Sequence, residues 1–198
     1  MTDAGRLQRL LEQIDRLNAE DPSRETIEGV PQPRELLYAQ RLTGWVLRLN
    51  PQASEALRIS ARGQHVRRWM IPRGRYPMTR AGYLRWRETL KVFHADTIAG
   101  LMREAGYPDE AIQRVRTLMG KRELGRDPET QALEDALCLV FLETQFADLR
   151  HKTPEEKMRD ILRKTWGKMS EPARAEALTL PWNEADRRYI ENAVRAVS

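Results

Sequence analysis

The stretch Ala136-Leu137-Cys138-Leu139-Val140-Phe141-Leu142 is apolar at every position. A helix without a polar face is stable in water only when other elements surround it, so this stretch predicts a buried central helix. The preceding Asp127-Pro128-Glu129, a capping residue followed by proline in the first turn, places the expected helix at about 128–150. Cys138 is the only cysteine of the chain, so an intrachain disulfide is excluded and a small buried apolar residue is expected there.

Apolar residues recur at helical spacing on both sides of this stretch. The stretches around 29–33 and 70–79 contain proline and glycine and are predicted as loops. The sequence therefore predicts an all-α fold, with residues 1–198 forming a single compact domain of about eight or nine helices. The expected helices lie at about 4–19, 34–49, 51–68, 80–104, 108–121, 128–150 and 154–168, with short helices after Ser170 and Asn183.

The positive charge of the chain is concentrated in one segment. Lys and Arg total 34 and Asp and Glu total 29, a net charge of +5, but residues 58–87 hold nine arginines, no lysine and no acid until Glu88. Subtracting these nine charges leaves the remaining chain at −4. The planar guanidinium group binds phosphate or carboxylate through two hydrogen bonds, so an anionic ligand is expected here. An individual arginine can instead be a solvated residue that pairs with an acid from another helix.

Features of a membrane or secreted protein are not found in the sequence. No apolar run approaches the roughly 18 residues needed to cross a bilayer. Residues 1–5 lack the basic and then apolar parts of a signal peptide. We therefore expect a cytoplasmic protein without a membrane partner.

Several polar residues do not fit a purely structural helical domain. At 100° per residue, Arg80, Tyr83, Arg87 and His94 fall within a stripe about 60° wide on the helix expected at 80–104. His65 lies near the end of the preceding predicted helix, and Glu134 with Asp135 directly precedes the apolar run. A carboxylate at the rim of a core helix needs a partner, which a metal ion, an arginine or a helix cap would provide. We expect the helices near 52–68, 80–104 and 128–150 to share a cavity.

Part of the chain resembles the HD-domain superfamily of metal-dependent phosphohydrolases. The resemblance covers roughly residues 35–145 and is carried by Tyr38-Ala-Gln-Arg-Leu42, Ser60-Ala-Arg-Gly-Gln-His65, His94 and Asp135. It implies a helical HD-like core at roughly 35–150, with the helices of 154–198 packed on it. His65, His94 and Asp135 would hold a divalent ion such as Mn, Mg or Fe, while Gln40 and Val66 stand at the positions of the first His and the paired Asp of the pattern.

A closer resemblance is to an uncharacterised family shared by bacteria and fungi, a domain of unknown function. It covers most of the chain, including Asp160–Lys168, and implies no established activity. It is carried by Gln64-His65-Val66-Arg67-Arg68-Trp69, Ile71-Pro72-Arg73, Tyr76-Pro77-Met78, Arg80 and Gly82-Tyr83-Leu84-Arg85-Trp86-Arg87.

The first functional hypothesis is a phosphohydrolase that acts on a nucleotide or another small phosphate ester. His65, His94 and Glu134 are the predicted catalytic residues, either around a metal-bound water or, without metal, with a histidine as general acid or base. Arginines would neutralise the phosphate in the transition state. The predicted substrate-binding residues are Arg41, Arg68, Trp69, Arg73, Tyr76, Arg80, Tyr83, Arg87 and Lys121.

Two other functions remain open at this point. A non-catalytic protein would bind a nucleotide or other anion, with Trp69, Tyr76, Tyr83 and Trp86 stacking on a base. Arginines interleaved with aromatic residues also suit RNA or single-stranded DNA. Nucleic acid ranks last because the rest of the chain is net negative. In each case we expect the loop at 70–79 to be irregular, partly mobile and ordered by an anion.

Overall fold

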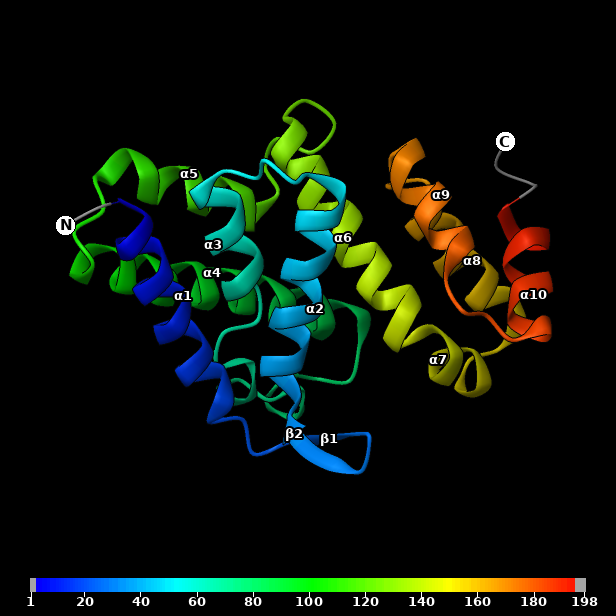
Figure 1. The fold of residues 1–198 in the computed structure, drawn as a ribbon. Helices are drawn as coiled ribbons and strands as arrows, with labels where there is room; N and C mark the ends of the chain where they lie inside the picture. The colour runs from blue at the N-terminus through cyan, green and yellow to red at the C-terminus, as the bar shows by residue number, and fades with distance from the viewer. Residues whose placement is uncertain (1–2, 195–198) are drawn as a thin grey trace.

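The computed structural model describes residues 3–194 as an assembly of helices (Figure 1). It confirms the predicted all-α fold, and the ten α-helices of residues 3–194 exceed the number expected. Two 3-10 turns, η1 (Arg68–Met70) and η2 (Arg73–Arg75), lie between the third and fourth helices. The helices are α1 (Asp3–Ala19), α2 (Arg34–Leu49), α3 (Glu55–Gly63), α4 (Arg80–Glu104), α5 (Asp109–Gly120), α6 (Pro128–Thr144), α7 (Phe146–Lys152), α8 (Glu155–Trp166), α9 (Glu171–Thr179) and α10 (Glu184–Val194).

Side-chain caps explain several of the helix starts. The Asp127 carboxylate accepts hydrogen bonds from the backbone N–H groups of Glu129 and Thr130 at the start of α6, where the sequence signal placed it. The start of α3 differs from the prediction, because the Ser54 hydroxyl accepts from the N–H of Leu57 and the helix begins after Ser54 instead of at Pro51.

Two predicted segments have a different structure. The helix expected at 128–150 is interrupted at Gln145, whose φ of −125° is not helical, so that α6 and α7 form with Phe146 fully buried just after the break. The loop expected near 29–33 is part of an antiparallel hairpin of β1 (Arg24–Ile27) and β2 (Val30–Pro33). Its two-residue turn places Glu28 and Gly29 at φ 50° and 82°, a conformation that glycine adopts readily.

α6 is the central helix, as its apolar sequence predicts. In Figure 1 it runs between the group α1–α5 and the group α7–α10. Leu139 and Val140 are fully buried in one core cluster with residues of α2, α3 and the C-terminal helices, and Cys138 is a buried free cysteine. A second cluster joins α1, α4 and α5 and includes Ile59 and Val66. α3 packs against both α4 and α6, so the segment after α3 lies close to both cores.

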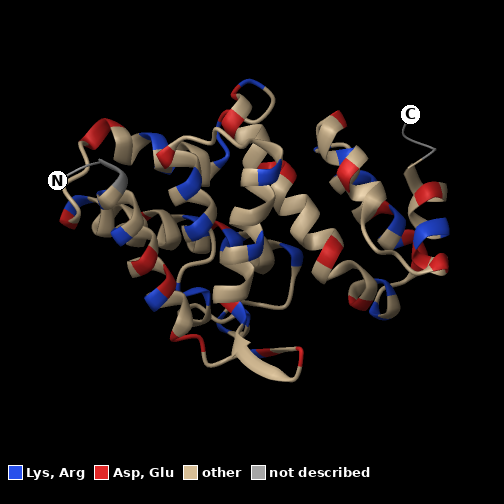
Figure 2. Cartoon of the chain, in the orientation of Figure 1, with Lys and Arg blue, Asp and Glu red and all other residues tan. Residues whose placement is uncertain are grey.

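Basic and acidic residues are interspersed along the helices (Figure 2). Within residues 3–194, no helix is both long and apolar enough to span a membrane.

Candidate functional site

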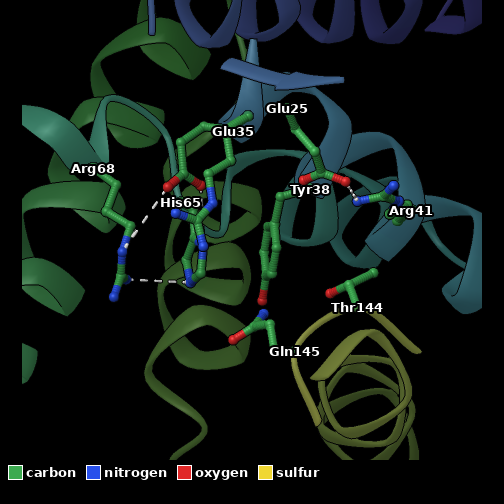
Figure 3. Close-up of a pocket in the computed structure, with 9 residues that line it drawn as sticks. Glu25, Glu35, Tyr38, Arg41, His65, Arg68, Thr144 and Gln145 are labelled. Carbon is green, nitrogen blue, oxygen red and sulfur yellow. Dashed lines mark hydrogen bonds and ion pairs between the residues drawn. The ribbon is translucent and has the colours of Figure 1, made fainter. Parts of the chain in front are cut away.

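A cavity of about 280 Å³, here called the α2 cavity, opens beside the first half of α2 (Figure 3). Side chains from the hairpin, from α2, from the segment after α3 and from the end of α6 surround it. Three arginines face two glutamates, which leaves one positive charge unbalanced on its walls. The lining residues are Glu25, Arg34, Glu35, Tyr38, Arg41, His65, Arg68, Thr144 and Gln145.

A sharp turn after α3 brings His65 and Arg68 to this cavity. α3 ends at Gly63, and Arg67 takes a left-handed backbone conformation with φ 52°. Between them, the Val66 side chain is fully buried in the cluster of α1, α4 and α5. The buried Val66 side chain and the left-handed backbone of Arg67 together direct the side chains of His65 and Arg68 toward α2.

His65 lies between a carboxylate and a guanidinium group. Its Nδ1 is 3.2 Å from Glu35 Oε2, and its Nε2 is 3.4 Å from Arg68 Nη1. Arginine can only donate hydrogen bonds, so Nε2 must be the accepting nitrogen and Nδ1 carries the hydrogen donated to Glu35. The Glu35 backbone N–H in turn donates to Asp21 Oδ2 at 3.0 Å, which holds the first turn of α2 in place. This arrangement leaves the lone pair of the imidazole on the nitrogen beside Arg68.

The surroundings keep this histidine neutral. Burial, together with the positive charges of Arg68 and Lys121, lowers the pKa of His65 well below its ordinary value of 6.5. Burial raises the pKa of Glu35, against the opposing effect of Arg68. The Tyr38 ring stacks on His65 with 4.0 Å between centroids, and its hydroxyl points toward Gln145 (Figure 3). Burial and Glu35 raise the pKa of Tyr38, so the phenol keeps its proton.

His94 lies behind His65, away from the cavity lining. Its ring centroid is 6.0 Å from that of His65, and its Nδ1 donates to the carbonyl oxygen of Val66 at 2.7 Å. The His94 side chain is buried and its Nε2 has no hydrogen-bond partner within the described part of the chain. Burial and the neighbouring His65 lower the pKa of His94 to about 3. The two predicted histidines therefore lie together, but only His65 reaches the α2 cavity.

Asp135, the third predicted metal ligand, is bound elsewhere. Its Oδ1 accepts from the backbone N–H of Ser170 at 2.8 Å and from Gln131 Nε2 at 2.9 Å, and its Oδ2 accepts from the Ser170 hydroxyl at 2.6 Å. A metal ion, an arginine and a helix cap were the expected partners of this carboxylate. The structure shows the helix cap, because Ser170 is the N-cap residue of α9. Across residues 3–194, no three His, Cys, Asp or Glu side chains are arranged to hold a metal ion. The predicted ligand set does not fit a divalent ion.

Glu134 and Lys121 are predicted site residues that pair with each other outside the α2 cavity. Lys121 Nζ lies 2.5 Å from Glu134 Oε2, and Lys168 Nζ lies 3.2 Å from Glu134 Oε1. Burial raises the pKa of Glu134, but the two ammonium groups outweigh this effect and the pKa lies below its ordinary value. A carboxylate held in this way is a poor proton acceptor.

The connection at 70–79 is more regular than expected, because its backbone groups are bound by side chains. Arg73 donates to the carbonyl oxygens of Tyr76 and Pro77 at 2.9 and 2.8 Å, and Trp86 Nε1 donates to that of Ile71 at 2.9 Å. A Cβ on Gly82 would lie 2.1 Å from the Pro77 oxygen, so α4 can approach the connection only with glycine at this position. Within the predicted loop, the prediction of irregular structure is wrong for η2, whereas the helix expected to continue to 68 ends at Gly63.

Arginines and aromatic rings alternate from α4 to the α2 cavity, and we call this set the arginine–aromatic ladder. The guanidinium of Arg87 lies 5.8 Å from the Tyr83 ring centroid, and that of Arg73 lies 6.0 Å from Tyr83 and 5.9 Å from Trp86. Arg68 completes the ladder at 4.8 Å from Trp86. The predicted residues Arg73, Tyr83 and Arg87 therefore support Arg68 and do not line the cavity.

Of the other predicted substrate-binding residues, one lines the α2 cavity, one lines a smaller cavity beside it, and two line neither cavity. Arg41 lines the α2 cavity and pairs with Glu25 at 2.7 Å, whereas Trp69 lines a smaller neighbouring cavity. Tyr76 and Arg80 line neither of these two cavities, and Arg80 is exposed.

Two arginines of the basic segment follow the simpler interpretation and pair with acids of α1 and its C-terminal end. Arg62 lies 3.4 Å from Asp15, and Arg67 lies 3.0 Å from Glu20.

Sequence reasoning missed Glu35, Tyr38 and Arg34. Glu35 and Tyr38 are separated by three residues, the spacing that places side chains on one helix face, and Arg41 is three residues further on. This stripe of polar residues at the start of a predicted helix was the available signal. Gln40, which takes the first His position of the HD pattern, is exposed instead.

The chain matches the model of a family described as a domain of unknown function (DUF4202) over residues 8–190. It belongs to the DUF4202 family. The expected membership in a family without assigned activity is thereby confirmed, whereas the resemblance to the HD-domain superfamily stays a prediction. No curated protein and no solved structure matches this DUF4202 chain significantly.

Proposed function

We propose that this DUF4202 protein hydrolyses a small phosphate ester in the α2 cavity, with His65 as general base and Arg68 as the main phosphate ligand. The observation that carries the proposal is the pair of contacts on His65: Glu35 Oε2 at 3.2 Å from Nδ1 and Arg68 Nη1 at 3.4 Å from Nε2. A general base needs a fixed ring and an accessible lone pair. The Glu35 contact fixes the ring, and Nε2 becomes accessible when Arg68 turns from it to the phosphate. The negative charge of the phosphate then offsets the positive charge of Arg68, which together with burial lowers the pKa of His65.

The reaction begins with a water molecule between His65 Nε2 and the phosphorus atom. Nε2 takes a proton from the water as its oxygen bonds to phosphorus, and the bond between phosphorus and the ester oxygen breaks. The leaving oxygen takes a proton from solvent, which reaches the open cavity. Glu35 stabilises the imidazolium formed, because its carboxylate accepts the Nδ1–H hydrogen bond throughout. The proton on His65 then passes to solvent and restores the neutral ring.

The arginines favour a phosphate over other ligands. The contact from Arg68 to His65 is long for a hydrogen bond, and a charged phosphate oxygen is a stronger acceptor than a neutral imidazole. The second contact of Arg68, from Nε to Glu35 Oε1 at 4.0 Å, is also too long for a hydrogen bond, so Arg68 can turn to the ligand. Arg34 is exposed at the same cavity, and its guanidinium has no hydrogen bond or ion pair within residues 3–194. Two guanidinium groups are thus available for one phosphate.

The test is phosphate release from a panel of phosphate esters by the wild-type protein and the His65→Asn variant. The asparagine amide retains a donor near the place of Nδ1 but removes Nε2. A loss of about 10² to 10⁴ in kcat is expected for removal of a general base. Arg85→Ala is the matched control from the basic segment, since Arg85 is exposed and lines neither cavity. Wild-type turnover no higher than that of His65→Asn on every ester would refute the proposal.

A second candidate is binding of the same anion without turnover. It is favoured by one contact, because the lone pair of His65 already accepts from Arg68 and would be blocked if Arg68 stayed there. In that case, titration calorimetry with inorganic phosphate detects binding that Arg68→Ala abolishes, while no ester is hydrolysed.

A further inference from the structure

A second cavity adjoins the α2 cavity, and we call it the tryptophan chamber. It has a volume of about 160 Å³ and shares Arg34, Glu35 and Arg68 with the α2 cavity. These three residues therefore form the boundary between the two spaces. The other residues that line the chamber are Asp21, Ser23, Trp69, Ile71, Pro72 and Trp86.

The two spaces differ in chemistry. The α2 cavity is surrounded by charged and hydrogen-bonding side chains, whereas the chamber adds two indole rings and two apolar residues. Its carboxylate, Asp21, is already bound by the backbone N–H groups of Ser23 and Glu35. A ligand that fills both must therefore carry an anionic group at one end and a flat, weakly polar group at the other.

Trp69 is the ring that remains free for such a group. Trp86 has guanidinium groups of the ladder near its ring, and its Nε1 is already bound to Ile71. Trp69 also lines the chamber, but its side chain has no hydrogen bond and no ring contact within residues 3–194. The half-buried indole thus presents an unused face and an unused N–H donor.

We propose that the substrate of this site is a nucleotide, with its phosphate at Arg68 and His65 and its base in the tryptophan chamber against Trp69. The inference rests on the proposed function and adds the substrate class to it. A heteroaromatic base matches both properties of Trp69, because it stacks on the indole face and carries acceptor atoms for the Nε1–H group. The sugar spans the boundary formed by Arg34, Glu35 and Arg68.

The experiment compares two substrates that share a phosphate ester and differ in the base. Steady-state kinetics with adenosine monophosphate and with glycerol 3-phosphate are measured for the wild type, Trp69→Ala and Trp69→Phe. Stacking of one base corresponds to about tenfold to hundredfold in affinity, so Trp69→Ala is expected to raise KM for the nucleotide by that factor and to leave glycerol 3-phosphate unchanged. Trp69→Phe keeps a ring and is expected to lie between the two.

Controls separate this inference from the proposed function. Met78→Ala removes an 82% exposed apolar side chain from the same connection and is expected to change neither substrate. Circular dichroism verifies the folding of each variant, and Trp69→Phe serves if Trp69→Ala does not fold. Titration calorimetry of adenosine monophosphate with the wild type and the Trp69 variants measures binding without turnover.

The outcomes are distinct. Equal turnover of both substrates, with no selective effect at Trp69, overturns the nucleotide inference and leaves the hydrolase proposal standing. Nucleotide binding that depends on Trp69, without any phosphate release, supports the chamber assignment and refutes the hydrolase proposal. Absence of both binding and turnover with adenosine, guanosine, cytidine and uridine monophosphates overturns the inference.

Discussion

Replacing Glu35 by glutamine separates the charge of this residue from its shape. In Glu35→Gln the amide oxygen can still accept from His65 Nδ1, so the ring keeps its orientation, but the imidazolium formed during catalysis loses a neighbouring negative charge. A hydrogen bond to a charged partner contributes about 1.5–3 kcal/mol and a neutral one about 0.5–1.5 kcal/mol. The difference of roughly 1–2 kcal/mol predicts a decrease in kcat of about 5- to 30-fold, measured by phosphate release.

Stability is expected to respond in the opposite direction. The pKa of Glu35 is raised by burial, so the folded protein binds this proton more tightly than the unfolded chain does. The contribution of Glu35 to the free energy of unfolding is therefore most favourable below its unfolded pKa and is lost as the pH rises through the folded pKa. At neutral pH the carboxylate is a cost that glutamine removes, and urea denaturation should show unchanged or higher stability.

Glu25→Gln is the matched control, because this variant removes a carboxylate from the same cavity. In the wild type, Glu25 pairs with Arg41 and not with His65. An equal loss of kcat in both variants, or full activity of Glu35→Gln, would show that the Glu35–His65 contact has no role in turnover.

Three further predictions concern stability. The pKa of His94 is lowered to about 3, so the contribution of this residue to the free energy of unfolding is favourable above the unfolded pKa near 6.5 and is lost as the pH falls. Urea denaturation at pH 7 and at pH 5 should therefore show a smaller loss of stability for His94→Asn than for the wild type. Arg114 and the hydrogen bonds at the start of α6 lower the pKa of Asp127 to about 2. Asp127→Ala removes the cap of α6 and one of the two carboxylates that bind Arg114, so we expect a loss of roughly 1–2 kcal/mol at pH 7 by denaturant titration and a smaller difference as the pH falls toward 2. Gly82→Ala forces a contact with the Pro77 oxygen and should lower the melting temperature, whereas Ala81→Gly, at the exposed neighbouring position, should have a much smaller effect.

Local signals predicted much of the helical framework. The apolar run 136–142 identified the buried central helix, and Asp127-Pro128 identified its start, because capping and patterning act within one or two turns. The bounds of α4 agree with the predicted 80–104 for the same reason. The break at Gln145 has no such signal, because no glycine or proline marks it and the burial of Phe146 depends on distant residues.

The candidate site depends more on contacts between distant segments. His65 was identified from its surroundings in the sequence, but its partner Glu35 is 30 residues away. Asp135 was expected to need a partner, and that partner is Ser170, 35 residues away and on another helix. Tertiary packing decides which of several acids or bases meets a given side chain, and residue spacing along the chain does not record it.

The arginine–aromatic ladder has a consequence for how this protein tolerates its own positive charge. Cations without acidic neighbours normally depend on dissolved counter-ions, whose influence changes with ionic strength over distances of about 10 Å. In the ladder, Tyr83 and Trp86 place the negative faces of their rings against the guanidinium groups of Arg68, Arg73 and Arg87. Unlike dissolved counter-ions, these rings are part of the fold, so their attraction for the guanidinium groups does not depend on the salt concentration. Arg68 Nε also lies 4.0 Å from Glu35 Oε1, and the Trp86 ring adds a second negative surface beside its guanidinium group without using a hydrogen-bond donor that an anion would need.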